Sequence, residues 1–111
     1  MLAAMLLHGH AQAQTEEQWD WCYGGIGVPA RNVQPPELLI SGCTAVIQSG
    51  IHRGRNLVVA FTNRGVGHRQ TFQYDRAFAD FEHARQDLDQ IVRLKRREVD
   101  PGAAEASLEP Q

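Results

Sequence analysis

Small and aromatic residues recur every three or four positions between Asn56 and Leu88, and this spacing constrains the fold most strongly. The first run contains Leu57, Phe61, Gly65 and His68, and the second contains Ala77, Phe81, Ala84 and Leu88. Residues at this spacing lie on one stripe of an α-helix. Because Gly65, Ala77 and Ala84 are small, two such helices can approach each other closely. The pattern therefore predicts a helical hairpin and not an active site.

The stretch AFTNRGVGHRQTFQYDRAFADFEHA, from Ala60 to Ala84, resembles a tetratricopeptide repeat of the bacterial kind. In that family a first helix containing Asn-Arg-Gly is followed by a second helix with the pattern YDRA-ADY--A. The resemblance covers about one repeat and implies an all-α helical hairpin. It assigns the packing between the two helices to Phe61, Gly65, His68, Ala77, Phe81 and Ala84.

Three positions depart from the family pattern. His68 stands in the place of a tyrosine, Phe72 in the place of the turn glycine, and Asp89 in the place of the proline that closes a repeat. These departures indicate a degenerate copy. Without the closing proline, the second helix is expected to continue until Pro101 and Gly102 stop it.

A third helix is predicted from Pro35 to Gly50. Pro36 suits a first helical turn, and Gly50 suits the C-terminal cap. Its apolar stripe contains Leu39, Cys43, Val46 and Ile47. A single helical pair cannot bury its own apolar face, so this helix resembles the second half of a preceding repeat whose first half is replaced by another segment. One and a half repeats leave an exposed apolar flank.

The two cysteines connect that replacing segment to the helices. Cys22 lies in a stretch rich in aromatic, glycine and proline residues without a helical period, and Cys43 lies on the apolar side of the third helix. A disulfide between them would contribute about 3 kcal/mol. Two free thiols are the alternative. The pattern Cys-x-Gly, two prolines and Ile-x-Gly-Cys-Thr is similar to the start of exported repeat proteins of proteobacteria.

Residues 1–13 are interpreted as the remnant of a signal peptide. Leu2 to Leu7 is a short apolar run, and Ala11-Gln12-Ala13 is a small-x-small cleavage site. The run lacks a preceding Lys or Arg, so its basic start is missing, with an upstream start codon as one explanation. A disordered apolar terminus is the alternative. Cleavage after Ala13 predicts a mature chain that begins at Gln14, in the periplasm or outside the cell. No segment has the apolar length of a membrane span.

Charge and motif content argue against several functions. Eleven Lys plus Arg against thirteen Asp plus Glu give a net charge of −2, which disfavours nucleic-acid binding. The basic run of residues 93–97 suits either the solvated last turn of a helix or contact with an acidic group. The glycines of residues 24–27 neither follow a strand pattern nor end in Gly-Lys-Ser/Thr, so they indicate a turn.

Neither a metal site nor catalysis is predicted. Five side chains could bind zinc but lack metal-type spacing, namely Cys22, Cys43, His52, His68 and His83. Three acidic residues are expected on the exposed side of the second hairpin helix, namely Asp75, Asp80 and Glu82. No nucleophile is paired with a base. The sequence therefore predicts no enzyme and no cofactor.

Function is expected at a surface, because the first helices of helical repeats line a concave face. The residues predicted to bind a protein or peptide there are Thr62, Asn63, Val66, Arg69 and Gln70. Asn63 and Arg69 can donate hydrogen bonds to an extended peptide or its carboxylate. The alternative for Asn63 is a bond to a neighbouring loop. Self-association, or docking onto a helical protein through the exposed flank, is the alternative use of the chain.

The sequence thus predicts an all-α fold of about three helices. Its parts are an irregular Cys-containing segment at 14–35, a helical domain similar to tetratricopeptide repeats at 36–100, and an acidic disordered tail at 101–111. The expected function is an exported, non-catalytic protein-interaction module. The alternative is a small periplasmic accessory or inhibitor protein that binds through an aromatic loop containing Trp19, Trp21 and Tyr23.

Overall fold

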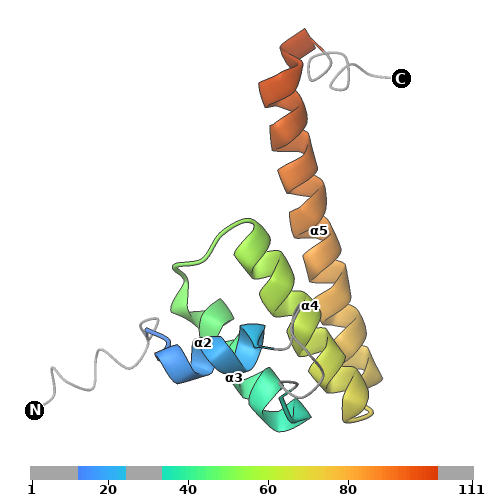
Figure 1. The fold of residues 1–111 in the computed structure, drawn as a ribbon. Helices are drawn as coiled ribbons and strands as arrows, with labels where there is room; N and C mark the ends of the chain where they lie inside the picture. Colours follow the sequence, from blue (N-terminus) through green and yellow to red (C-terminus); the bar gives the residue numbers. More distant parts are fainter. Residues whose placement is uncertain (1–12, 25–33, 103–111) are drawn as a thin grey trace, which may run out of the picture.

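The computed structural model describes residues 13–24 and 34–102, and in these ranges the chain forms helices and no strands (Figure 1). The helices are α2 (Glu16–Tyr23), α3 (Pro36–Ser49), α4 (Arg55–Gln70) and α5 (Tyr74–Val99). Each helix packs against the next one along the chain, and α2 also touches α4. The predicted all-α fold is confirmed. The expected signal-peptide remnant and disordered tail fall largely on residues 1–12 and 103–111, outside the described part.

The segment at 14–35, predicted to be irregular, contains the helix α2. Thr15 caps this helix, because its Oγ1 accepts a hydrogen bond from the N–H of Gln18 (3.1 Å) while Gln18 Oε1 accepts one from the N–H of Thr15 (2.9 Å). This reciprocal capping box satisfies backbone donors at a helix start. The capping signal lies ahead of the aromatic stretch that begins at Trp19, and a helix of eight residues is too short to show a clear period.

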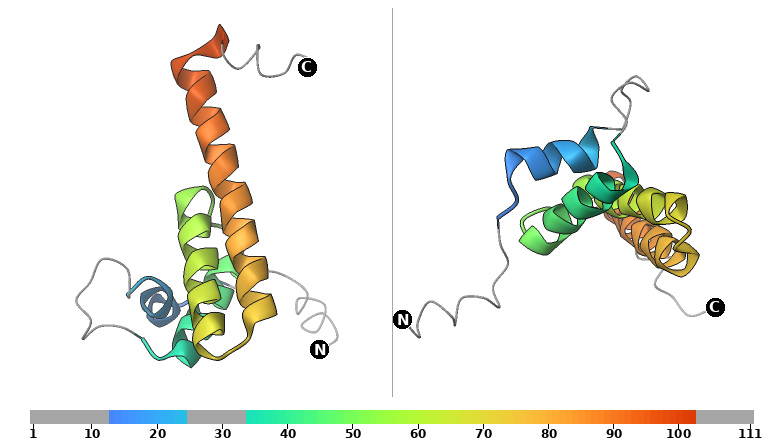
Figure 2. Two further views of the ribbon diagram at one scale, coloured as in Figure 1. Left: turned by 90° about the vertical axis from the view of Figure 1, so that its right-hand side faces the viewer. Right: turned by 90° about the horizontal axis from the view of Figure 1, so that it is seen from below.

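α3 begins and ends as predicted. Pro36 is its first residue, and Gly50 follows its last turn with a φ of 74°, a left-handed conformation that favours glycine. Cys43 and Val46 on its inner face are fully buried. The predicted disulfide between Cys22 and Cys43 is confirmed and joins α2 to α3. The described chain therefore forms two successive hairpins, α2–α3 and α4–α5 (Figure 2).

Small residues set the distance between α4 and α5. Ala77 and Ala84 of α5 are buried, and so is Phe61 of α4. A Cβ atom at Gly65 would lie 2.5 Å from the ring of Phe81, closer than two carbon atoms can approach. Glycine is therefore required where the two backbones come together at this ring.

The turn between α4 and α5 contains Phe72, which has a φ of 63°. This left-handed conformation is disfavoured by about 1–2 kcal/mol for a residue with a Cβ atom. The family resemblance places a glycine here, and the backbone has a conformation that glycine adopts readily. Because Phe72 is 77% exposed, little burial offsets the strain.

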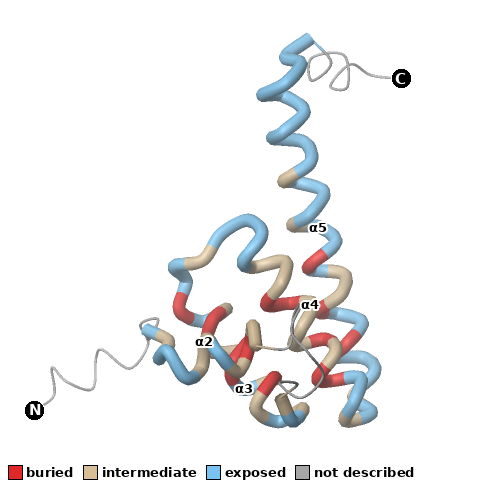
Figure 3. Tube along the Cα trace, in the orientation of Figure 1, coloured by how far each residue is buried: buried red, intermediate tan, exposed pale blue. Residues whose placement is uncertain are grey.

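As predicted, α5 continues beyond Asp89, and it ends at Val99. Asp100 follows it and precedes Pro101, whose ring disfavours the helical conformation in the residue before it. α5 has 26 residues and α4 has 16, so the C-terminal part of α5 projects beyond α4 (Figure 1). Buried residues gather where the helices meet, whereas this projecting part is mostly exposed (Figure 3).

Candidate functional site

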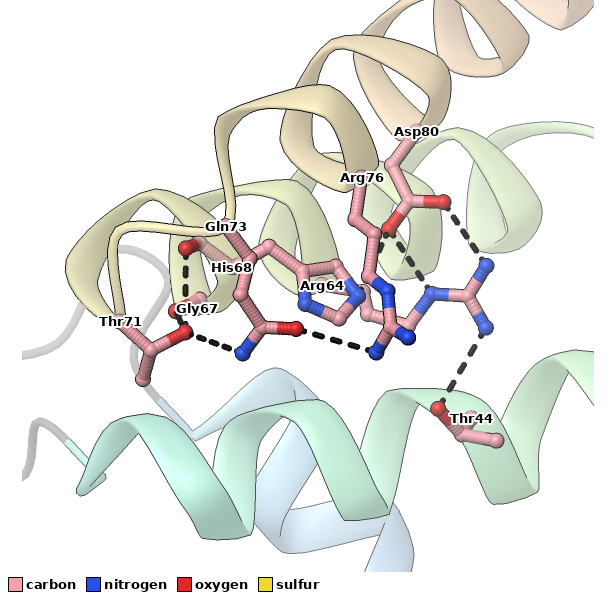
Figure 4. Close-up of polar contacts among 8 residues, drawn as sticks. All are labelled: Thr44, Arg64, Gly67, His68, Thr71, Gln73, Arg76 and Asp80. Atoms are coloured by element: carbon pink, nitrogen blue, oxygen red, sulfur yellow. Dashed lines mark hydrogen bonds and ion pairs between the residues drawn. The ribbon is translucent and has the colours of Figure 1, made fainter.

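A buried ionic cluster lies at the centre of the α4–α5 contact (Figure 4). Arg64 donates two hydrogen bonds to Asp80, from Nε to Oδ2 and from Nη2 to Oδ1, and each is 2.8 Å long. Arg64 Nη1 also lies 3.4 Å from the hydroxyl oxygen of Thr44 on α3. A bidentate pair of this geometry fixes the orientation of both side chains. Arg64 therefore links α4 to both α3 and α5.

His68 is the third member of the cluster. Its Nε2 lies 3.7 Å from Asp80 Oδ2, and its Nδ1 has no hydrogen-bond partner in the described part of the chain. Burial lowers the pKa of His68 below its usual 6.5, and this outweighs the Asp80 carboxylate, which raises the pKa. Arg64 and Arg76 lower it further. The imidazole is therefore neutral at pH 7.

A chain of hydrogen bonds closes the turn beside His68 (Figure 4). The backbone N–H of Gln73 donates to the carbonyl oxygen of His68 (2.8 Å), and Gln73 Nε2 donates to Thr71 Oγ1 (2.7 Å). Arg76 Nη1 donates to Gln73 Oε1 (3.0 Å). These bonds fix the backbone on both sides of Phe72.

The buried position of Asp80 corrects the prediction that it lies on the exposed side of α5. Asp80 is 5% exposed. It follows Ala77 by three residues and precedes Ala84 by four, so it belongs to the helical stripe that packs against α4. Sequence reasoning also did not identify Arg64. A buried carboxylate requires a cationic or hydrogen-bonding partner, and this requirement is the signal that could have found the pair.

The residues predicted to bind a peptide do not share one exposed face. Asn63 Nδ2 donates a 2.6 Å hydrogen bond to the carbonyl oxygen of Cys22. This amide is therefore bonded within the chain, as the alternative expected, but to helix α2 and not to a loop. Val66 packs against the buried core beside α2 and α3, and Thr62 is half-buried. Arg69 and Gln70 are exposed at the C-terminal end of α4.

The aromatic residues proposed as an alternative binding epitope make internal contacts. Trp19 packs against the rings of Tyr23 and His52, with centroids 4.2 and 4.7 Å apart. The Tyr23 hydroxyl donates a 2.7 Å hydrogen bond to the carbonyl oxygen of Asn56, and burial raises the pKa of Tyr23 to about 12. Trp21 is half-buried. These contacts join α2 to His52 in the loop between α3 and α4 and to Asn56 at the start of α4. Residues 25–33 of the aromatic loop lie outside the described part.

A row of six hydrophobic and two cationic residues runs along α5, and all of them except Phe81 are exposed. Tyr74, Phe78 and Val99 are 61%, 68% and 74% exposed, and Leu88 and Val92 are about half exposed. The row alternates between spacings of four and three, as the a and d positions of a heptad do. Its members, named here the α5 stripe, are Tyr74, Phe78, Phe81, Arg85, Leu88, Val92, Lys95 and Val99. The alternating spacing is the signal that could have located the expected apolar flank.

The described residues offer neither a metal centre nor a membrane span. In residues 13–24 and 34–102, no three or more His, Cys, Asp or Glu side chains are placed to hold a metal ion. No helix in these ranges combines the length and the apolar character needed to cross a bilayer.

Compared with protein-family models, with curated proteins and with solved structures, the chain finds no match in any of the three. The tetratricopeptide resemblance therefore rests only on the residues from Ala60 to Ala84 that match the family pattern.

Proposed function

We propose that this protein is a non-catalytic protein-interaction module of tetratricopeptide type, which binds another protein chain through the α5 stripe. The observation that carries the proposal is the row of five exposed hydrophobic side chains, namely Tyr74, Phe78, Leu88, Val92 and Val99. Contiguous exposed apolar surface marks sites of protein contact. Aromatic side chains such as Tyr74 and Phe78 are effective anchors in such contacts.

The spacing of the stripe indicates a helical partner. Alternating spacings of four and three keep a row of side chains facing a second helix along its length. At 1.5 Å per residue, the 26 residues of α5 extend about 39 Å. An amphipathic helix of similar length on the partner chain would cover the stripe.

The α4–α5 contact supports the proposal because it holds the stripe rigidly. The hydrogen-bonded pair of Arg64 and Asp80 fixes the angle of α5 on α4. The ring of Phe61 stacks on His83 with centroids 3.9 Å apart, and Cζ of Arg64 lies over the Phe61 ring, 5.4 Å from its centroid. A surface that is ordered before binding loses less conformational entropy when the partner docks.

The proposed location is the periplasm or the cell exterior. Disulfides form and persist in oxidising compartments, and the Cys22–Cys43 bridge is fully buried. The small-x-small sequence that ends at Ala13 agrees with signal-peptidase cleavage. A mature N-terminus at Gln14 in protein purified from the native host would support export, and retention of Met1 would contradict it.

Capture of partners from the exported fraction of the native host tests the function. Immobilised wild-type protein is compared with Phe78→Glu, which places a charge in the stripe, and with Leu94→Glu. Leu94 is 55% exposed and lies outside the stripe, so this variant is the matched control. Wild type and Leu94→Glu are expected to retain the same partner, and Phe78→Glu is expected to lose it. Equal capture by all three proteins would contradict binding through the stripe.

A further inference from the structure

We propose that the occupant of the α5 stripe is a second copy of this chain, whose α5 lies antiparallel to the first. This inference rests on the function proposed above, because it names the partner of the same surface. It is carried by three properties of α5: the division of its charge, the pairing of its stripe residues and the charges beside the stripe.

The charge of α5 is divided between its two halves. In residues 74–89, five acidic side chains against two arginines leave a formal charge of −3. Asp80 is buried and paired with Arg64, so about −2 of this charge remains toward a partner. In residues 90–99, four basic side chains against one glutamate leave +3. An antiparallel pair places each acidic half against the basic half of the second copy, whereas a parallel pair places like charges together. Charge complementarity therefore favours a second copy in the antiparallel orientation.

Antiparallel pairing also matches large stripe residues with smaller ones. When the twofold axis passes between residues 86 and 87, Tyr74 faces Val99 of the second copy. The part of the Phe81 ring that Gly65 of α4 leaves uncovered faces Val92 of the second copy. Large and small side chains that alternate across an interface can interdigitate without voids. In the single chain, Tyr74 and Val99 are mostly exposed and Val92 is about half exposed, whereas Phe81 is partly covered by α4.

The two cationic stripe residues fit the same register. Lys95 faces Phe78 of the second copy, where its aliphatic stem covers the ring and its ammonium group is attracted to the ring face. Arg85 faces Leu88 of the second copy. The guanidinium of Arg85 is drawn to the side of the stripe by hydrogen bonds to Glu82 (3.2 Å) and Asp89 (2.8 Å). Polar residues within a helical seam specify register and orientation.

The residues beside the stripe determine where the second copy lies. Ala77 and Ala84 on one side are buried against α4, so the second copy packs toward the opposite side. In an antiparallel pair, equivalent sides of the two helices face each other. Asp75 of one copy then faces Arg96 of the other, and this contact occurs twice. Glu82 and Asp89 meet near the axis, and Arg85 in each copy offsets their charge.

Other segments of this chain are poorer occupants. Residues 103–111 contain a proline and one large apolar residue, Leu108, so they offer little apolar surface to a stripe of about 39 Å. At the N-terminal end, the first described residues lead into α2. In the described part this helix contacts α3 and α4 and not α5, so it does not cover the stripe.

Sedimentation equilibrium of the disulfide-bonded chain from residue 14 onward tests the pairing. The wild-type chain is expected to form a dimer. Phe78→Glu and Val92→Glu are each expected to weaken the dimer at least about 10-fold, because each places a charge in the apolar interface. Leu94→Glu, an equal change at a site as exposed as Val92 but outside the stripe, is expected to leave the dimer unchanged. All three residues are exposed, and circular dichroism verifies that the variants keep their helices.

A charge exchange tests the orientation. Asp75→Arg and Arg96→Asp are each expected to weaken the dimer several-fold, and the double variant is expected to recover most of the lost affinity. The two residues lie 21 positions apart on one helix, about 31 Å, so they cannot interact within one chain. Failure of the double variant to recover would overturn the antiparallel register.

Two outcomes overturn the second copy as occupant. One is a wild-type chain that sediments as a monomer at its highest soluble concentration. The other is a dimer that persists unchanged in both Phe78→Glu and Val92→Glu. If the monomeric wild type still captures a different protein through Phe78, the proposed function stands and only the identity of the occupant fails. If Phe78→Glu changes neither self-association nor capture, both proposals fail.

Discussion

In the α2–α3 hairpin, a disulfide joins two fully buried cysteines, Cys22 and Cys43. In the α4–α5 hairpin, the corresponding place is taken by the ion pair of Arg64 and Asp80, beside the contact of Gly65 with the Phe81 ring. The first hairpin therefore depends on the redox state of its compartment, and the second depends on charge and side-chain size. Because the α5 stripe belongs to the second hairpin, its presentation does not depend directly on the disulfide.

Removing the carboxylate of Asp80 and removing the disulfide are expected to have the two largest effects. Asp80→Asn leaves the Arg64 guanidinium without its ionic partner, and breaking a buried pair destabilises a protein by about 3–5 kcal/mol. Because the Arg64 side chain is 21% exposed, water offsets part of this loss, and about 3 kcal/mol is expected. Urea unfolding followed by far-ultraviolet circular dichroism measures the change.

Asp89→Asn is the matched control for this variant. Asp89 pairs with Arg85 at 2.8 Å, but both side chains are exposed, and exposed ion pairs contribute little to stability. If Asp80→Asn and Asp89→Asn unfolded at the same urea concentration, the α4–α5 contact would not depend on the buried pair.

Loss of the disulfide is expected to destabilise the protein by about 3 kcal/mol, on the loop-entropy model for a separation of 21 residues. The double variant Cys22→Ala/Cys43→Ala tests this by urea unfolding. Hydrogen exchange should show that α2 loses protection first, while the buried stretch of α5 at residues 77–84 loses it last. Equal loss in both places would show that the two hairpins form one cooperative unit.

The bridge itself predicts an intact mass two hydrogens below that of the dithiol, and two free thiols in periplasmic protein would refute it.

Enlarging Ala77 tests the dependence of the second hairpin on side-chain size. Ala77 is buried against α4, so Ala77→Leu should force the helices apart and lower stability by about 1–3 kcal/mol. Partner binding should weaken as well, because the angle of α5 would change. Ala79→Leu makes the same change at an exposed position of α5 and should melt like the parent protein. If both variants melted like the parent, tight packing would not hold this hairpin.

Elements with complete local signals could be predicted from sequence. α3 has Pro36 at its start and Gly50 at its end, and the spacing of small residues in α4 and α5 gives their contact face. α2 could not be recognised in the same way, because its signal is a capping box at Thr15 followed by a helix of only eight residues.

The candidate site was less accessible to sequence reasoning. The charge of Asp80 suggests exposure, and only its position on the packed stripe together with a partner in another helix explains its burial. The inward bond of Asn63 likewise depends on the carbonyl oxygen of Cys22, 41 residues away in the sequence. The spacing of the α5 stripe can be read in the sequence, but that its residues stay exposed depends on where α4 packs against α5.

The titration of His68 adds a pH dependence to the second hairpin. Its pKa in the folded protein is below the usual 6.5 because burial disfavours the charged form, so the unfolded chain binds more protons between the two pKa values. Its contribution to stability is therefore complete above about pH 6.5 and is lost as the pH falls through that value. Urea unfolding from about pH 7.5 to 5.5 should show this loss in wild type and less of it in His68→Gln. His83→Gln, at a more exposed histidine of α5, is the control, and parallel losses in all three proteins would exclude His68 as the cause.

The smallest effect is expected at the turn, where Phe72 tests whether the backbone of the second hairpin is strained. Phe72→Ala removes the exposed ring and keeps the Cβ atom, whereas Phe72→Gly removes both. A left-handed φ disfavours a Cβ atom by about 1–2 kcal/mol, and the greater freedom of glycine in the unfolded chain offsets roughly 0.5–1 kcal/mol of this gain. Phe72→Gly should therefore be more stable than Phe72→Ala by up to about 1.5 kcal/mol, as measured by thermal and urea unfolding. If the alanine variant were as stable as the glycine variant or more stable, the turn would relax at no cost in free energy. The hydrogen bonds of Thr71 and Gln73 would then not be holding residue 72 in its left-handed conformation.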